Sequence, residues 1–257
     1  QILIAGLLPR EAGRWLCLAS PALRGAAAAA PPVVDLRLDF GRRAGFSAMR
    51  SLLRSPCLRV VGAALDRGMS ADEFEVVLAA LGGSHVRFLD AVRCRLLQRL
   101  PSTLSPAWNL EELDLSFCAS LSCLAGLAGG FPRLRRLHLH RCPALEDISP
   151  LASCAELQML RLSGCPSVSD LSGLASCRGL RELDLRGCTR VRDLSPLAGC
   201  KLLQQLSLSG CKRLSGLSAL ARCQNLAELD VAGCLELEIP DELAANPTLR
   251  ILRPDSE

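Results

Sequence analysis

Aromatic residues are scarce in this chain of 257 residues, which has no tyrosine, two tryptophans and six phenylalanines. Hydrophobic residues nevertheless make up 49% of it, so the chain is long enough and apolar enough to bury a large core. That core must be built mainly from leucine, alanine and valine, through many small and similar contacts. The same composition excludes a disordered tail.

Long hydrophobic runs and a strong charge excess are also missing. The apolar stretch at 25–34 is short and broken by two prolines, so no segment reaches the 18 uncharged apolar residues typical of a membrane span. The net charge is only +4 and is spread along the chain, which gives no general case for a nucleic-acid partner. We therefore expect no membrane segment, and nucleic acid only as a minor alternative that would use a local basic patch.

Catalytic and metal-binding motifs are absent as well. The phosphate-loop, zinc-protease and serine-hydrolase patterns do not occur, and there are only three histidines. His138 and His140 alternate along one segment and so share a strand face, but no carboxylate or cysteine ligand is specified beside them. We therefore predict that the protein is not an enzyme and binds no metal or cofactor.

What the chain does contain is an internal repeat with the pattern L-x-x-L-x-L-x-x-C. Each closing cysteine follows apolar residues eight, five and three positions earlier, as Leu180, Leu183 and Leu185 precede Cys188. Successive copies are 23 or 24 residues apart. The closing cysteines are Cys94, Cys118, Cys142, Cys165, Cys188, Cys211 and Cys234.

This register resembles the leucine-rich repeat (LRR) family over about residues 33–253. The resemblance implies an α/β solenoid with a parallel sheet on its concave side, and the alternation of leucines in each copy agrees with a short strand. The domain predicted at 32–257 has about ten strands. Its ends are closed by a helical cap at 1–31 and by the proline and charges after Arg253.

The convex side is expected to change along the chain. After Cys188 the apolar residues Val191, Leu194 and Leu197 recur every third position, which matches a 3₁₀ segment better than an α-helix. Earlier repeats are longer, and residues 70–82 carry helix start and stop signals. The sequence therefore predicts α-helices on the early convex side, and 3₁₀ or irregular segments later.

The regular cysteines admit three interpretations: metal ligands, disulfide partners or buried wall residues. A ladder does not gather four ligands around one point, and the parallel Cβ directions of equivalent residues oppose bridging. In the LRR family this position is an inward asparagine or cysteine that contacts backbone of the adjoining loop. We therefore predict small buried thiols at these positions. So many free thiols indicate a reducing intracellular compartment, for which the cytoplasm is our prediction.

The outward residues between the leucines form the predicted recognition surface. They fall into acidic and basic blocks. Acidic groups on adjoining strands can neutralise part of the basic block by cross-strand pairing. A solvated charged sheet is the plain alternative to a strip that binds an acidic protein segment; a phosphate or RNA site is a third. Exposed aromatic residues beside arginines are of the types that often dominate binding energy. The predicted partner-binding residues are Phe88, Asp114, Phe117, Arg135, Arg136, His138, His140, Arg161 and Asp184.

The first 31 residues support two interpretations. The turn at residues 9–11 and the segment around Trp15 and Leu18 resemble the distal part of an F-box, which implies a Skp1-type adaptor as partner and a role as substrate receptor of a cullin ubiquitin ligase. The other interpretation is a cap that covers the exposed end of the solenoid. We predict a protein-binding scaffold or assembly subunit of a larger intracellular complex, with the ligase receptor as alternative and an RNA-associated subunit as a third, less favoured one.

Overall fold

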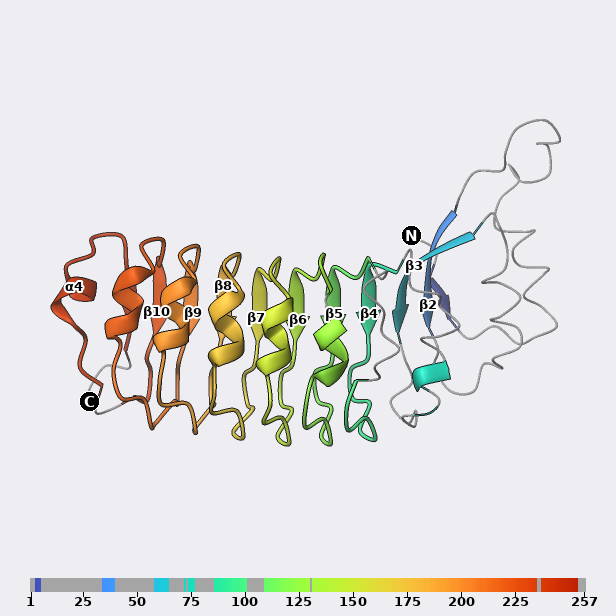
Figure 1. Cartoon of the computed structure of the whole chain (residues 1–257), viewed down its shortest axis with the longest axis horizontal. Helices are drawn as coiled ribbons and strands as arrows, with labels where there is room; N and C mark the ends of the chain where they lie inside the picture. Colours follow the sequence, from blue (N-terminus) through green and yellow to red (C-terminus); the bar gives the residue numbers. More distant parts are fainter. Residues whose placement is uncertain are drawn as a thin grey trace, which may run out of the picture.

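The computed structural model describes residues 3–5, 34–39, 58–64, 72, 74–76, 86–100, 109–129, 131–234 and 237–253, with side chains from residue 72 onward. Strands recur once per repeat in these residues and lie side by side in chain order (Figure 1). They form one parallel sheet of eleven strands. The strands are β1 (Leu3–Ala5), β2 (Val34–Asp39), β3 (Leu58–Ala64), β4 (Phe88–Asp90), β5 (Glu112–Asp114), β6 (Arg136–His138), β7 (Met159–Arg161), β8 (Glu182–Asp184), β9 (Gln205–Ser207), β10 (Glu228–Asp230) and β11 (Arg250–Leu252).

The strands are short because each repeat supplies only the centre of its leucine pattern to the sheet. In β5 the middle residue Leu113 is fully buried, while Glu112 and Asp114 on either side are half-buried and point away from the core. The register is strict, since Leu113 pairs with Leu137 and Leu137 pairs with Leu160. Each repeat therefore places equivalent side chains in straight rows across the sheet.

In the described residues, five 3₁₀ segments form the opposite wall, as the three-residue spacing predicts. They are η2 (Ala125–Gly129), η3 (Ser149–Ser153), η4 (Ser172–Ser176), η5 (Ser195–Gly199) and η6 (Ser218–Arg222). Pro150 and Pro196 lie in the first turn of their segments, where no amide donor is needed. An aspartate two residues earlier accepts the Ser195 amide in η5 (Asp193, 2.8 Å) and the Ser172 amide in η4 (Asp170, 2.8 Å).

The cysteines are wall residues, as predicted. The thiol of Cys188 donates to the Leu162 carbonyl at 3.2 Å, and that of Cys211 donates to the Leu185 carbonyl at 3.1 Å. All twelve cysteines in the described part of the chain have free thiols. A second buried series closes the back segments, in which Cys200 donates to the Leu174 carbonyl at 3.6 Å. The thiols that make these hydrogen bonds thus join their own repeat to the one before it.

Both ends of the array differ from the expectation in detail. The strand β1 lies inside the predicted helical cap and pairs with β2; the rest of that cap, with its F-box resemblance, lies outside the described residues. At the other end, the 23-residue repeat spacing counted from Leu229 predicts Leu252 inward and Arg253 on the outer row. That register was wrong by one residue, because Ile251 pairs with Leu229 and Leu252 pairs with Asp230.

The early convex side is described only in part. Residues 72 and 74–76 are helical, within the helix expected at 70–82, and Phe74 is buried. A short helix, α4 (Asp241–Ala244), takes the place of a 3₁₀ segment in the last repeat. Among the described residues, no helix is long and apolar enough to cross a membrane.

Candidate protein-binding face

The outward side chains of strands β4 to β11 form a continuous surface, which we call the sheet face; it is the concave face of the predicted solenoid. Two rows run across it, one from the first and one from the third residue of each strand. The first row contains Phe88, Glu112, Arg136, Met159, Glu182, Gln205, Glu228 and Arg250. The second row contains Asp90, Asp114, His138, Arg161, Asp184, Ser207, Asp230 and Leu252.

The aspartates of the second row have a structural task. Asp114 accepts the backbone amide of Ser116 at 2.8 Å, and Asp230 accepts that of Ala232 at 3.0 Å. Asp90 and Asp184 make the same contact two residues on, at 2.9 and 3.1 Å. These hydrogen bonds shape the turn that ends each strand. Asp114 and Asp184, two predicted binding residues, therefore also stabilise the turns after β5 and β8.

Cross-strand pairing neutralises part of the basic block, as the charge pattern indicated. Arg136 donates to Glu112 at 2.8 Å, and Nε2 of His138 lies 3.5 Å from the same carboxylate. Beside them, Nε and Nη2 of Arg87 donate to the two oxygens of the Glu111 carboxylate, each at 2.8 Å. These hydrogen bonds from Arg87 hold the pKa of Glu111 below its usual range.

His140 is set apart from the exposed charges. It is half-buried, and its Nδ1 lies 2.5 Å from the Ser163 hydroxyl oxygen. Burial lowers its pKa, because removal from water disfavours the charged imidazolium. His140 therefore contributes less positive charge to the sheet face than the sequence pattern indicated.

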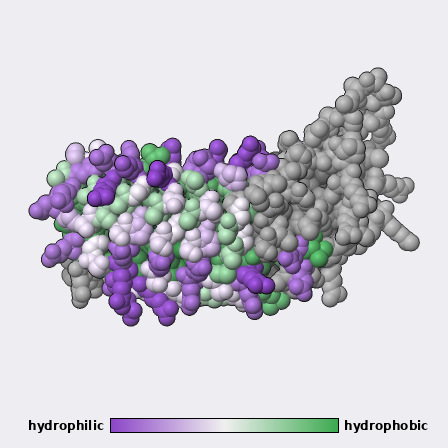
Figure 2. Space-filling view, viewed as in Figure 1, coloured by the Kyte–Doolittle hydropathy of each residue, from purple (hydrophilic) through white to green (hydrophobic). Residues whose placement is uncertain are grey.

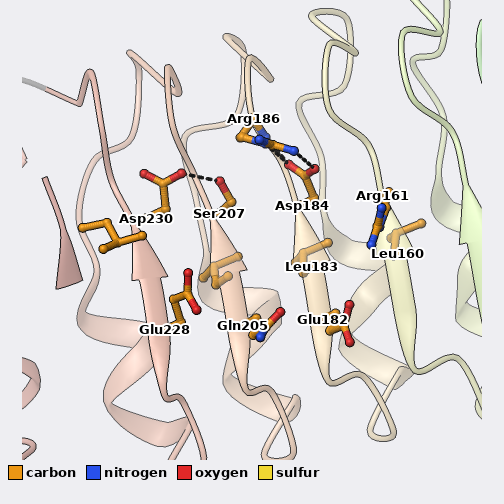
Figure 3. Close-up of a pocket in the computed structure, with 12 residues that line it drawn as sticks. Leu160, Arg161, Glu182, Leu183, Asp184, Arg186, Gln205, Ser207, Glu228 and Asp230 are labelled. Atoms are coloured by element: carbon orange, nitrogen blue, oxygen red, sulfur yellow. Dashed lines mark hydrogen bonds and ion pairs between the residues drawn. The ribbon is translucent and has the colours of Figure 1, made fainter. Parts of the chain in front are cut away.

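A groove of about 270 Å³ crosses strands β7 to β10 on the sheet face. Figure 3 shows Glu182, Gln205 and Glu228 along one side of it, with Arg161 and Asp230 among the residues of the other row. The Asp184 carboxylate accepts two hydrogen bonds from the Arg186 side chain, at 3.0 and 2.8 Å. Partial burial opposes ionisation of Asp184, yet the hydrogen bonds from Arg186 lower its pKa overall.

The remaining groove charges are available to a partner. Within the described residues, no ion pair involves Arg161, Glu182 or Glu228. Ser207 donates to Asp230 at 2.8 Å, which fixes one more carboxylate in place. The groove thus presents one cation at the β7 end and several carboxylates toward β10.

The structure divides the predicted binding residues into two groups. Phe88, Asp114, Arg136, His138, Arg161 and Asp184 lie in the two rows of the sheet face. Arg135 directly precedes β6 and is exposed. His140 and Phe117 lie in the turns after their strands, and Phe117 has a positive φ of 63°. Phe117 lies beyond the end of β5, so the alternation of inward and outward residues along the strand does not predict its orientation.

Sequence reasoning missed two contributors to this region. Arg186 lies two residues after Asp184, so the alternation that selects outward residues also selects it. Arg93 lies one residue before Cys94, the position that Phe117 holds before Cys118, and its guanidinium carbon is 5.2 Å from the Phe117 ring centroid. Only the shared repeat position signals this contact in the sequence.

Metal binding finds no constellation to support it in the described part of the chain. No group of three or more histidine, cysteine or carboxylate side chains there is arranged to hold a metal ion.

The hydrophilic residues on the face seen in Figure 2 gather mainly along the two long edges of the repeat row.

Comparison with known proteins gives the class of the fold. Residues 155–199 match the family model described as Leucine Rich repeats (2 copies). The leucine-rich repeat domain of the type III effector XCV3220 (XopL) superposes with a TM-score of 0.61 at 23% identity, covering 94% of this chain and 83% of that one. An internalin (inlF) from Listeria monocytogenes superposes with a TM-score of 0.59 at 20% identity, covering 86% of this chain and 66% of that one. No curated protein matches the sequence.

The repeat pattern, the parallel sheet and these likenesses agree on one class. The fold is a leucine-rich-repeat solenoid, with a sheet on one side and mainly 3₁₀ segments on the other. Residues 155–199 match leucine-rich repeats by sequence, and the remaining described repeats share the same fold.

Proposed function

We propose that this protein is a non-catalytic binding module that holds a protein partner on the sheet face, as a scaffold or assembly subunit of a larger intracellular complex. The observation that carries the proposal is the groove across β7 to β10, which is lined by charged and polar side chains of several repeats. A rigid array of rows can match an extended or folded partner over many repeats at once.

The charge distribution supports a partner of mixed character. Arg161 lies on β7 at one end of the groove, and Glu182 and Glu228 line it further along, on β8 and β10. A partner segment with an acidic group followed by basic groups would complement this order. Because the arginines and carboxylates are half-buried at most, such contacts contribute to specificity and association rate more than to affinity.

The test compares two variants that carry the same charge change. Phe88→Ala combined with Arg136→Glu and Arg161→Glu alters the sheet face, while Arg178→Glu with Arg222→Glu alters exposed residues near the ends of η4 and η6. Partners recovered with the tagged wild-type protein from native extract are identified by mass spectrometry, and their affinities for the purified variants are then measured.

We expect the sheet-face variant to lose roughly tenfold or more in affinity, and the variant on the opposite side to retain it. Equal affinity of all three proteins for every recovered partner would refute the proposal. Circular dichroism melting confirms that each variant remains folded.

The ligase-receptor alternative depends on residues 1–31, of which the structure describes only Leu3–Ala5. It is tested directly by mixing the full chain with a recombinant Skp1-type adaptor and measuring complex formation by size-exclusion chromatography. A stable complex would favour that alternative, and its absence would favour the scaffold role.

A further inference from the structure

One turn position carries large side chains in a backbone conformation that later repeats reserve for glycine. Arg93, Phe117 and Arg141 directly precede their ladder cysteines and have φ values of 64°, 63° and 52°. The four following repeats place Gly164, Gly187, Gly210 and Gly233 at this position, with φ between 71° and 74°. A left-handed conformation is unfavourable for a non-glycine residue, so these three side chains carry a backbone cost.

The three side chains stack on one another across β4, β5 and β6. The Arg93 guanidinium carbon lies 5.2 Å, and that of Arg141 5.8 Å, from the centroid of the Phe117 ring. Backbone hydrogen bonds fix this alignment, because the Arg93 amide donates to the Ser116 carbonyl at 2.8 Å and the Phe117 amide to the His140 carbonyl at 2.6 Å. Cation–π contacts of this kind are weak at exposed sites and offset only part of the backbone cost.

The positive groups of the stack remain open to a ligand. Arg93 and Arg141 are exposed, and no ion pair joins either guanidinium to a carboxylate of the described residues. Each lies at the edge of the sheet face, one turn beyond the second row. A guanidinium that is held against a ring has lost part of its side-chain freedom before binding, so less entropy is lost when it pairs with a carboxylate.

We propose that the Arg93–Phe117–Arg141 stack anchors an acidic segment of a partner protein. This inference rests on the proposed protein-binding function and names the chemistry of one contact. Carboxylates of the partner pair with the two guanidinium groups, and an apolar side chain between them covers the Phe117 ring. The two arginines are two repeats apart, about 10 Å at the usual strand spacing, which is about one three-residue turn of a polyproline II segment, in which residues i and i+3 lie on the same side. The matching segment carries acidic residues at positions i and i+3.

Charge favours an acidic peptide over nucleic acid at this edge. Asp90 and Asp114 end β4 and β5, three residues before Arg93 and Phe117, and would repel a long run of phosphates more strongly than a segment with two carboxylates. A nucleic-acid site gains its affinity from many cations, whereas this edge offers two that are free of ion pairs within the described residues. A short segment with two carboxylates matches what the stack can neutralise.

The test replaces the stack with the residue that the later repeats use. In the variant Arg93→Gly/Phe117→Gly/Arg141→Gly, glycine adopts the positive φ without cost, so the fold is expected to keep or raise its melting temperature. The probes are fluorescent peptides with Asp or Glu at i and i+3 and varied residues between them, beside the same peptides with Asn or Gln. Affinities are read by fluorescence anisotropy, with single-stranded RNA as a parallel probe.

We expect acidic peptides with an apolar residue between the carboxylates to bind the wild-type protein, and the glycine variant to bind them at least about tenfold more weakly. The control Arg178→Ala/Arg222→Ala removes the same charge elsewhere and should bind as the wild type does. If no acidic peptide binds better than its neutral counterpart, or if the glycine variant binds equally well, the proposal is overturned. Loss of RNA binding alone in the glycine variant would also overturn it.

The result separates this inference from the proposed function. The glycine variant leaves the groove residues Arg161, Glu182 and Glu228 intact. If partner binding depends on the groove residues but not on the stack, the proposed function stands and only the stack anchor is refuted.

Discussion

Single residues in this solenoid are limited by how closely neighbouring repeats approach. The clearest case is Gly173 in η4, where a Cβ atom would lie 2.4 Å from the Ile148 carbonyl oxygen. That oxygen belongs to the backbone of the preceding repeat and cannot turn aside as a flexible side chain does. The wall of 3₁₀ segments is thus close-packed by backbone as well as by leucine side chains.

We predict that Gly173→Ala lowers the free energy of unfolding by about 1–3 kcal/mol, because the added methyl group overpacks this contact. The measurement is urea denaturation followed by circular dichroism. Gly216→Ala is the matched control, since nothing lies within 4 Å of its added Cβ atom, and it should change stability by less than about 0.5 kcal/mol. Equal stability of the two variants would show that η3 and η4 do not pack as described.

At the scale of elements, the strand and the cysteine after it act as one unit. The inward leucines bury the strand, and the thiol then donates to a carbonyl of the preceding repeat, as Cys211 does to Leu185. Burial raises the pKa of Cys118 to about 11 and that of Cys211 to about 12, because a thiolate would lose its hydration. These thiols are therefore unreactive while the repeats remain stacked.

We predict that iodoacetamide at about pH 8 modifies half-buried Cys123 at least tenfold faster than Cys118, Cys188 or Cys211 in the native protein. In denaturant the four sites should react at similar rates. Peptide mapping by mass spectrometry measures each site separately. Native labelling of Cys188 as fast as that of Cys123 would contradict the buried wall.

The element pattern was predictable where each residue type has one role. Leucine spacing and the regular cysteines predicted the strands, the 3₁₀ wall and the buried thiols. The last strand was misplaced because its repeat is one residue shorter: Ile251, not Leu252, pairs with Leu229, and both residues are apolar, so composition gives no sign of the shift. The stack of Arg93 on Phe117 was missed because a positive φ is signalled in sequence by glycine, and these repeats lack glycine there.

At the scale of the whole molecule, equal repeats give a rigid row whose two sides have different tasks. One side is formed by the 3₁₀ segments and the other by the parallel sheet (Figure 1), whose outward positions carry rows of charged residues. Ion pairs such as Arg136 with Glu112 neutralise charges near β5 and β6. The groove across β7 to β10 includes Arg161, Glu182 and Glu228, which form no ion pair within the described residues. The site charges could be read from the sequence, but not their pairing, since pairing depends on side-chain geometry between strands.

The most direct test of the account is to ask which side of the row a partner touches. A photo-crosslinking amino acid is placed at Met159, which lies in the first row of the sheet face, or at Ala175, which is exposed in η4. After irradiation in native extract, crosslinked proteins are identified by mass spectrometry. We expect a specific partner crosslinked from Met159 and absent from Ala175; specific crosslinks from Ala175 alone would show that the sheet face is not the binding surface.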